Sequence, residues 1–354
     1  MIEVQIVNQE NINDFIDIPK KLYDARQIVQ NESEERKILS KEHTLSKYFE
    51  VTGFVCYQDQ IPVARCMLTI YDDREEVYIG YFECVDDSGV AKVLFDFVEE
   101  QIHLLGKKRI VGPVDASFWI RYRMKINCFD TRPYFSEPNN MPYYQKLWEI
   151  CGYQTLKLYT SNRFSRFKKK DLYKEKNVKR YHQFMNKGYK FVSPSTQNWD
   201  EALSDVYSLM IELYSDFPVY SRITEEDFKS LFMDYKSILD CSVVKLAYYK
   251  DEPVAFFIGI PDYHNHIYGK IGLAQIIYIL SKRIRSSNYI MLYLGVKKEH
   301  LGLGLAMTQT MIENVHKKRA SSISAFMMDG KVTQSYIAEN CIKTYEYALF
   351  YKEI

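Results

Sequence analysis

Near the end of the stretch from Tyr289 to Ala306, Gly302 and Gly304 stand at a spacing that suits the binding of an anion. The apolar run that precedes them, 289–296, has the length and the β-branched and aromatic content of a buried strand. After the glycines, apolar residues recur on one face of a helical pattern. The first turn of a helix leaves backbone N–H groups without partners and carries partial positive charge, and glycine lets a ligand approach the backbone closely. The stretch therefore predicts a strand, a glycine turn and a helix that can hold a diphosphate.

The spacing of these glycines also has a plainer explanation. The stretch lacks the Gly-Lys-Ser/Thr of a P-loop, and it does not match a G-x-G-x-x-G fingerprint. Two glycines at this spacing also occur in ordinary tight turns between a strand and a helix. On the spacing alone, an anion site and a structural turn remain equally good interpretations.

The composition is that of a globular chain with room for two domains. The 354 residues are 47% hydrophobic, which supports sizeable cores, and the formal net charge is +1. This charge gives no general attraction to nucleic acid or to a membrane surface. The most apolar segment, Ile267–Leu280, contains Lys270 and is shorter than the roughly 20 residues of a membrane-spanning helix. It predicts a buried or half-buried helix.

The cysteines and histidines predict no metal site. The seven cysteines contain no C-x-x-C pair, and the seven histidines do not cluster at ligand spacing. Scattered cysteines of odd number are typical of free thiols in a reducing compartment. The first residues, Met1-Ile-Glu-Val-Gln, lack the basic and apolar parts of a signal peptide. The expected location is the cytoplasm.

The predicted elements occur twice in the same order, as a hairpin, a strand, a helix and a further strand. In the first copy they are expected at 53–70, 77–85, 90–105 and 109–114. In the second copy they are expected at 241–260, 289–296, 305–318 and 323–327. Two long stretches that match in order and spacing indicate a tandem duplication. Alternating strands and helices indicate an α/β class with a mixed sheet in each half.

The run Val296-Lys-Lys-Glu-His-Leu-Gly-Leu-Gly-Leu-Ala306 resembles the acyl-CoA-binding segment of the GNAT superfamily of N-acyltransferases. In that family a strand ending in Val is followed by a Gln/Arg-x-x-Gly-x-Gly/Ala loop that opens a helix. Gly304 and Ala306 occupy the last two motif positions, whereas Leu301 stands where the family usually has Gln or Arg. The order of elements in each copy is also similar to the GNAT fold. The resemblance implies two tandem GNAT-like modules, each a mixed, mostly antiparallel sheet flanked by helices.

The expected domains are an N-terminal module at 1–160, a basic linker at 161–195 and a C-terminal module at 196–354. In place of the glycine turn, the N-terminal module has Val85-Asp-Asp-Ser-Gly-Val90. Its two carboxylates would repel a diphosphate. The N-terminal module is therefore expected to be degenerate for CoA, and the C-terminal module to bind acetyl-CoA or another acyl-CoA.

The stretch 163–190 holds eleven Lys and Arg residues against Asp171 and Glu175. One interpretation is an attractor for an anionic substrate, the CoA phosphates or RNA. The other, which we favour on the sequence, is a solvated linker helix with charged faces.

The resemblance implies a set of cofactor-binding residues on the second strand–turn–helix unit. They are Leu294, Gly295, Val296, Leu301, Gly302, Leu303, Gly304, Leu305 and Ala306. A backbone N–H near Gly295 or Val296 would face the thioester carbonyl.

Acyl transfer to an amine also needs a base for the amine and an acid for the departing thiolate. In the family the acid is often a Tyr, and Tyr336 is the nearest candidate; a packing role is the alternative. The matching position in the first copy falls on Trp148, which cannot supply that proton. Glu83 and Asp329, each near a strand end, are candidate bases, with an ion pair between domains and a helix cap as their alternatives.

Three functions follow from these features. The first is an acyl-CoA-dependent N-acyltransferase that acetylates an amine of a small molecule or a peptide. The second is a non-catalytic protein that binds acyl-CoA or another small ligand. The third, an aminoacyl-tRNA-dependent ligase on the same fold, is supported only by the basic stretch. Neither a membrane nor a nucleic acid is an expected partner.

Overall fold

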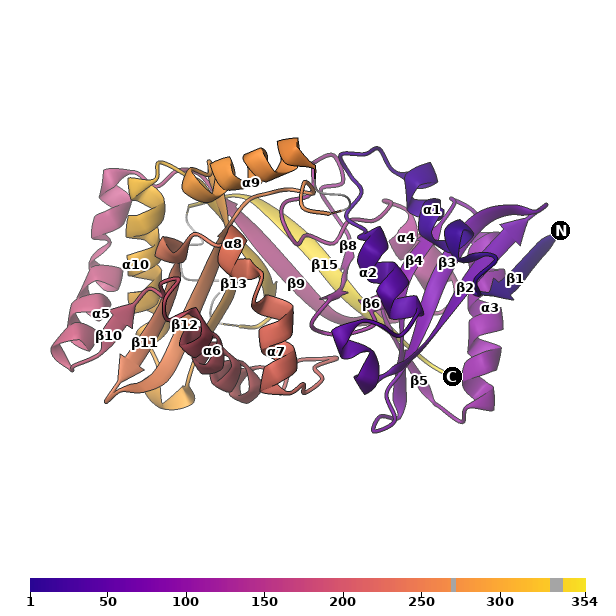
Figure 1. The fold of residues 1–354 in the computed structure, drawn as a ribbon, viewed down its shortest axis with the longest axis horizontal. Coiled ribbons are helices and arrows are strands. Elements are labelled where there is room, and N and C mark those ends of the chain that lie inside the picture. Colours follow the sequence, from indigo (N-terminus) through magenta and orange to yellow (C-terminus); the bar gives the residue numbers. More distant parts are fainter. Residues whose placement is uncertain (269–271, 332–339) are drawn as a thin grey trace. The chain divides into compact units, whose positions relative to one another are not determined.

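The computed structural model describes residues 1–268, 272–331 and 340–354, and the chain divides into two compact units (Figure 1). Unit 1 comprises Met1–Leu158, Tyr268 and Glu346–Ile354. Unit 2 comprises Tyr159–Ile267 and the described residues between 272 and 345.

Unit 1 is a sheet with strand order β1-β2-β3-β4-β5-β15, flanked by helices. Its elements are β1 (Ile2–Ile6), α1 (Ile12–Leu22), α2 (Glu32–Leu39), β2 (Glu50–Gln58), β3 (Ile61–Ile70), β4 (Glu76–Cys84), α3 (Ser88–Leu104), β5 (Arg109–Gly112), β6 (Val114–Asp115), β7 (Arg121–Tyr122), β8 (Met124–Lys125), α4 (Tyr144–Ile150) and the part of β15 (Cys341–Glu353) from Glu346 on. Neighbouring strands are antiparallel except β4 and β5, which are parallel.

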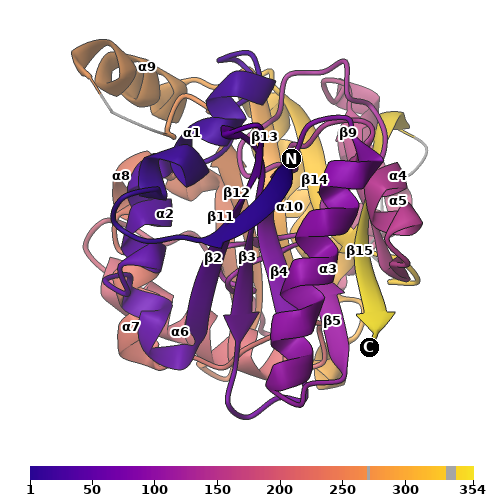
Figure 2. The ribbon, with the colours of Figure 1, turned by 90° about the vertical axis from the view of Figure 1, so that its right-hand side faces the viewer.

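The two faces of this sheet are covered differently. Leu94, Phe95 and Val98 of α3 recur at helical spacing and pack in one core with Cys66 of β3. Figure 2 shows α3 lying along one face of the sheet. Side chains alternate along a strand, so Arg65, the preceding residue, faces the opposite side, where its guanidinium reaches α1 and α2. The α1 face therefore contains a buried cation.

Unit 2 repeats this plan with strand order β10-β11-β12-β13-β14-β9. Its elements are the part of β9 (Gln154–Phe164) from Tyr159 on, η2 (Lys169–Tyr173), α5 (Glu175–Asn186), β10 (Lys190–Val192), α6 (Trp199–Leu213), α7 (Glu225–Phe232), α8 (Tyr235–Ile238), η3 (Cys241–Val243), β11 (Val244–Tyr249), β12 (Glu252–Pro261), α9 (Leu273–Ile284), β13 (Asn288–Val296), η4 (Lys298–His300), α10 (Leu303–Lys317), β14 (Ser321–Met328) and the start of β15. Among the described neighbours from β10 to β9 in this order, β13 and β14 are parallel and the other pairs are antiparallel.

Helices also cover both faces of the unit 2 sheet. Phe257 of β12 packs in one core with Met307 and Met311 of α10. Phe256, the preceding residue, contacts the ring of Tyr214 at the C-terminal end of α6, so it faces the other side. Helix α10 and its neighbour α5 therefore cover one face, and α6 covers the other.

Each sheet takes one strand from the other half of the sequence. In unit 1, β15 pairs with β5, with Phe350 opposite Gly112. In unit 2, β9 pairs with β14, with Phe164 opposite Ser322. The two halves of the sequence are thus not the two folded units.

The predicted fold class and both predicted hairpins are confirmed. Asp59 and Gln60 form the first hairpin turn with φ of 49° and 68°, and Lys250 and Asp251 form the second with φ of 52° and 63°. Polar residues of this kind tolerate the left-handed conformation that two-residue hairpins need. The stretch 161–195, expected as a linker, contains the end of β9, η2, α5 and β10, all in unit 2.

One apolar segment is placed differently from its prediction. The segment 267–280 was expected to form a buried or half-buried helix, but the helix α9 in this segment begins at Leu273, exposes Leu273, Ile277 and Ile284 and buries only Ile279. The apolar pattern identified the helix, but a pattern does not specify whether another element covers the apolar face. No helix in the described ranges is long and apolar enough to cross a lipid bilayer.

Candidate functional site

An opening in the sheet of unit 2 lies beside the predicted glycine turn. β13 and β14 pair from Asn288 opposite Ser321 to Met291 opposite Ser324, and not beyond. β13 stays paired with β12 as far as Val296. In the described chain, the edge of β13 that follows Met291 is therefore left without a strand on the β14 side.

The backbone at this edge points its polar groups into the opening. The N–H of Lys297 donates to the carbonyl oxygen of Val254 at 3.0 Å. Because backbone groups alternate between the two edges of a strand, the N–H groups of Val296 and Leu294 face away from β12. The carbonyl oxygen of Leu294 accordingly accepts a hydrogen bond from the Tyr214 hydroxyl at 3.5 Å. No motif in the sequence indicates Tyr214, which reaches this edge from the end of α6.

The glycine turn has the geometry of a helix start that only glycine adopts readily. Gly302 is the N-cap of α10 with φ of 92°, and no side chain caps the helix. The four residues that follow it, Leu303, Gly304, Leu305 and Ala306, are buried in the first turns of α10. Leu301, at the motif position usually filled by Gln or Arg, is 82% exposed. The turn therefore combines a fixed helix end with an accessible surface.

Arg180 of α5 borders this turn, although the sequence analysis did not select it. A Cβ atom placed on Gly302 would lie 3.6 Å from the guanidinium carbon of Arg180. Arg180 donates to the neutral side chain of Gln183 at 3.3 Å and is exposed. A basic group thus lies where Leu301 supplies none, because α5 packs along α10. In the sequence, the high density of Lys and Arg residues at 163–190 was the feature that could have indicated Arg180.

The corresponding place in unit 1 is filled. β4 and β5 also pair only over a short stretch, from Glu76 to Tyr78. Beyond it, a Cβ on Gly80 would lie 1.9 Å from the carbonyl oxygen of Val114, and one on Gly112 would lie 2.6 Å from the ring of Trp148. Backbone and a buried indole occupy the space that unit 2 leaves open.

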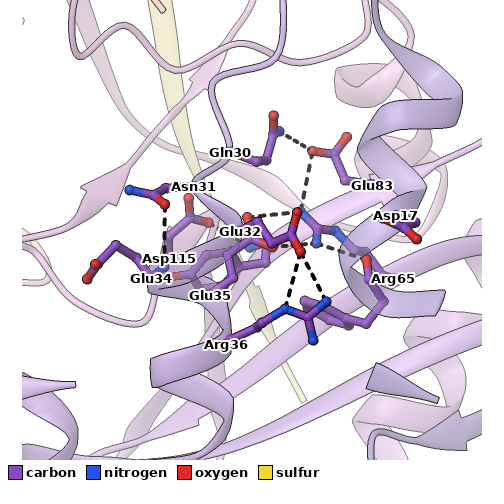
Figure 3. A network of polar contacts seen from close by, with 12 residues as sticks. Asp17, Gln30, Asn31, Glu32, Glu34, Glu35, Arg36, Arg65, Glu83 and Asp115 are labelled. Carbon is purple, nitrogen blue, oxygen red and sulfur yellow. Dashed lines mark hydrogen bonds and ion pairs between the residues drawn. The ribbon is translucent and has the colours of Figure 1, made fainter. Parts of the chain in front are cut away.

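Unit 1 instead contains a buried network of charged groups (Figure 3). The guanidinium of Arg65 pairs with the carboxylate of Glu35 at 2.6 Å and lies 4.0 Å from that of Glu83. Arg121 pairs with Asp115 at 2.7 Å. Asp115 also accepts the N–H of Tyr81, a residue with φ of 50° at an irregularity in β4. The network thus holds β4 against the helices on one face of the sheet.

Glu83 is the member of this network that can exchange a proton near neutral pH. Its carboxylate accepts hydrogen bonds from the hydroxyls of Tyr23 at 2.6 Å and Tyr144 at 2.7 Å, and from the amide of Gln30. Burial raises its pKa to about 7, against the opposing effect of the Arg65 charge. The side chain borders a cavity of about 50 Å³ in unit 1. A carboxyl of this kind is suited to acid–base work or to sensing pH.

The stability of the protein should therefore fall as Glu83 loses its proton. Between the ordinary pKa of 4.5 and the folded pKa of about 7, the folded chain keeps a proton that the unfolded chain releases. The free energy of unfolding that Glu83 contributes then decreases by about 3 kcal/mol as the pH rises through this window. Urea unfolding of the wild type and of Glu83→Gln between about pH 5 and pH 8 measures this contribution of Glu83 to the free energy of unfolding. The wild type should lose stability relative to Glu83→Gln as the pH rises, because the neutral amide of glutamine does not titrate, and a constant difference would contradict the assignment.

The candidate residues do not all belong to one unit. Glu83 belongs to unit 1, as do its four partners named above, whereas the glycine turn belongs to unit 2. Asp329 is exposed in the turn after β14. Tyr336 lies outside the described residues.

Solved structures share this architecture over almost the whole chain. A tandem GNAT protein from the clavulanic acid biosynthesis pathway matches 100% of this chain and 98% of its own, with a TM-score of 0.55 and 10% sequence identity. The chain has the tandem GNAT fold. GCN5-related N-acetyltransferases from Anabaena variabilis (TM-score 0.52, 9% identity) and Sphaerobacter thermophilus (TM-score 0.50, 12% identity) match the fold over 99% of this chain and over 72% and 95% of their own chains. No family model and no curated protein matches the sequence.

Proposed function

We propose that the chain transfers an acyl group from acyl-CoA to an amine, and that unit 2 holds the CoA. One observation carries the proposal: in unit 2 the divergence of β13 and β14 after Met291 lies next to a helix that begins at a left-handed glycine, Gly302. An open strand edge and an open helix start together present backbone N–H donors to a long, anionic thioester.

The diphosphate of CoA would bind at the start of α10, where the helix N–H groups and Arg180 supply positive charge. The thioester would then lie along the free edge of β13. The N–H of Val296 or Leu294 would donate to its carbonyl oxygen and stabilise the negative charge that develops there when the amine attacks. The acceptor is an amine of a small molecule or peptide. Its nitrogen bonds to the carbonyl carbon and loses a proton, the C–S bond breaks, and the CoA thiolate leaves and takes up a proton as the free thiol.

Unit 1 is proposed not to bind CoA. Its corresponding space is occupied by Val114 and Trp148, and Asp87, at the start of α3, already caps that helix through the N–H groups of Gly89 and Val90. A carboxylate at a helix start competes with a phosphate for the same donors.

Calorimetry with CoA and acetyl-CoA, followed by thiol release in the presence of a panel of amines, tests the proposal. Binding with release of CoA by at least one amine is the expected result. Binding without turnover by any amine would favour the alternative, a non-catalytic acyl-CoA-binding protein. Absence of binding by CoA and acetyl-CoA would refute both.

Replacing Arg180 with glutamine should weaken CoA binding about tenfold. The substitution removes one charge-assisted contact to phosphate, a loss of about 1.5 kcal/mol. The loss should shrink when the ionic strength rises from about 0.1 M to several times that value, since exposed charges are screened. Lys179→Gln is the matched control, because Lys179 is an exposed residue of the same helix about 100° around its axis. Equal losses in the two variants would mean that Arg180 makes no particular contact.

A further inference from the structure

Unit 2 contains an apolar cavity of about 60 Å³ between its sheet and the helices α6 and α7. Its walls are aliphatic and aromatic. The lining includes Trp199, Ala202 and Val206 of α6, Phe228 of α7, and Leu292 and Tyr293 of β13. An apolar cavity of this size does not favour water, which needs polar partners.

The cavity reaches the place where the sheet opens. Leu292 is the first residue of β13 after Met291, the last residue paired with β14. The pairing with β12 is irregular at the same place, because Ile258 lies opposite Tyr293 and Gly259 lies opposite Met291. The irregularity inserts Leu292 as an extra residue. Such a bulge breaks the alternation of side chains, so that Leu292 and Tyr293 both line the same cavity.

The wall chemistry selects an uncharged, aliphatic occupant. Burying an ammonium or carboxylate against these side chains would cost far more than it returns, since no opposite charge lines the cavity. A hydrocarbon chain gains free energy there with every methylene it buries. A thioester carbonyl held at Leu294 or Val296 would place its acyl carbons next to Leu292 and Tyr293.

We propose that the acyl donor of this protein carries an aliphatic chain of about four to six carbons, which this cavity binds. The proposal rests on the proposed function and specifies its substrate. The chain length follows from the volume of the cavity. A water molecule needs roughly 10–15 Å³ of a cavity measured in this way, and a methylene group is about as large as a water molecule. The cavity of about 60 Å³ therefore has room for about four to six carbons. Acetyl, with a single methyl group, would leave most of the cavity empty.

Calorimetry with CoA, acetyl-CoA, hexanoyl-CoA and dodecanoyl-CoA tests this proposal. Each buried methylene should raise the affinity about fourfold, so hexanoyl-CoA, which has four more methylenes, should bind roughly 200 to 250 times more tightly than acetyl-CoA. Dodecanoyl-CoA should bind no better than hexanoyl-CoA. Equal affinities for CoA, acetyl-CoA and hexanoyl-CoA would overturn the acyl cavity and leave the proposed function intact. No binding by any of them would overturn the proposed function and this proposal with it.

Filling the cavity should remove the preference without removing CoA binding. Ala202→Phe adds a ring to a buried position of the cavity wall, so hexanoyl-CoA should bind no more tightly than acetyl-CoA. Val206→Phe fills the same space from the next turn of α6 and serves if the first variant does not fold. Unchanged preference in a folded variant would contradict the proposal.

The fluorescence of Trp199 gives a measurement that needs no repacked variant. Trp199 is buried and lines the cavity, so 6-bromohexanoyl-CoA should quench the emission of the wild type, whereas hexanoyl-CoA should not. The quenching should disappear in Trp199→Phe, which retains Trp119 and Trp148 of unit 1. Quenching that persists in Trp199→Phe would place the acyl chain elsewhere.

Discussion

Replacing Arg65 with methionine should destabilise unit 1 by about 3–5 kcal/mol, the largest effect on stability that we expect from a single substitution. Arg65 is fully buried, and its guanidinium faces the carboxylates of Glu35 and Glu83. Methionine keeps much of the volume but leaves two buried carboxyl groups without their cation. Urea unfolding in a Trp199→Phe background measures the loss, because Trp119 and Trp148, the remaining fluorophores, both belong to unit 1.

Two controls separate the loss of charge pairing from general damage. Arg36→Met removes an exposed partner of Glu32 on α2, a pair that also appears in Figure 3, and should cost less than about 1 kcal/mol. The double variant Arg65→Met/Glu35→Met should recover part of the loss, because it removes a cation and an anion together. If Arg65→Met costs no more than Arg36→Met, the buried network does not stabilise unit 1 as described.

Replacing Gly302 with aspartate should weaken the binding of acyl-CoA about 30- to 100-fold more than replacing it with asparagine. At position 302, where φ is 92°, the left-handed backbone costs both side chains a similar conformational free energy. Only aspartate puts a negative charge beside the bound diphosphate, a repulsion of about 2–3 kcal/mol at an exposed helix start. Calorimetry with hexanoyl-CoA and acetyl-CoA on both variants measures the difference.

The asparagine variant is the internal control of this comparison. It should retain measurable CoA binding, with a thermal unfolding midpoint equal to that of the aspartate variant. Equal affinities in the two variants would show that no phosphate lies near Gly302, and the cofactor would have to be sought away from α10.

The repeated α/β plan could be predicted because it depends on local sequence. Side-chain periodicity and turn residues such as Asp59 and Asp251 specify strands, helices and hairpins over short distances. The pairing of β15 with β5 could not be predicted, since Phe350 and Gly112 lie far apart in the sequence and no local pattern states which strand pairs with which. The exposure of α9 was missed for the same reason: its periodicity says nothing about what packs on it.

The candidate site was predictable in part. The glycine turn follows from the residue types and the resemblance, but Arg180 reaches it only because α5 packs along α10, and the sequence placed that stretch in a linker. The sequence contains one indication of the charged network of unit 1: Arg65 is a charged residue inside the otherwise apolar run Val63-Ala-Arg-Cys-Met67 of β3. Its partner Glu35 lies on a different element, so the pairing itself required the three-dimensional structure.

The position of β15 has a consequence for how the protein is made. The ribosome produces the residues of β1 to β5 before those of β10 to β14, and it produces the strand that completes the first sheet, from Glu346 to Glu353, only after both. Until β15 has been made, the edge of β5 presents unpaired backbone groups of the kind that invite aggregation. The sheet of unit 1 can therefore be completed only after the strands of unit 2 have been synthesised.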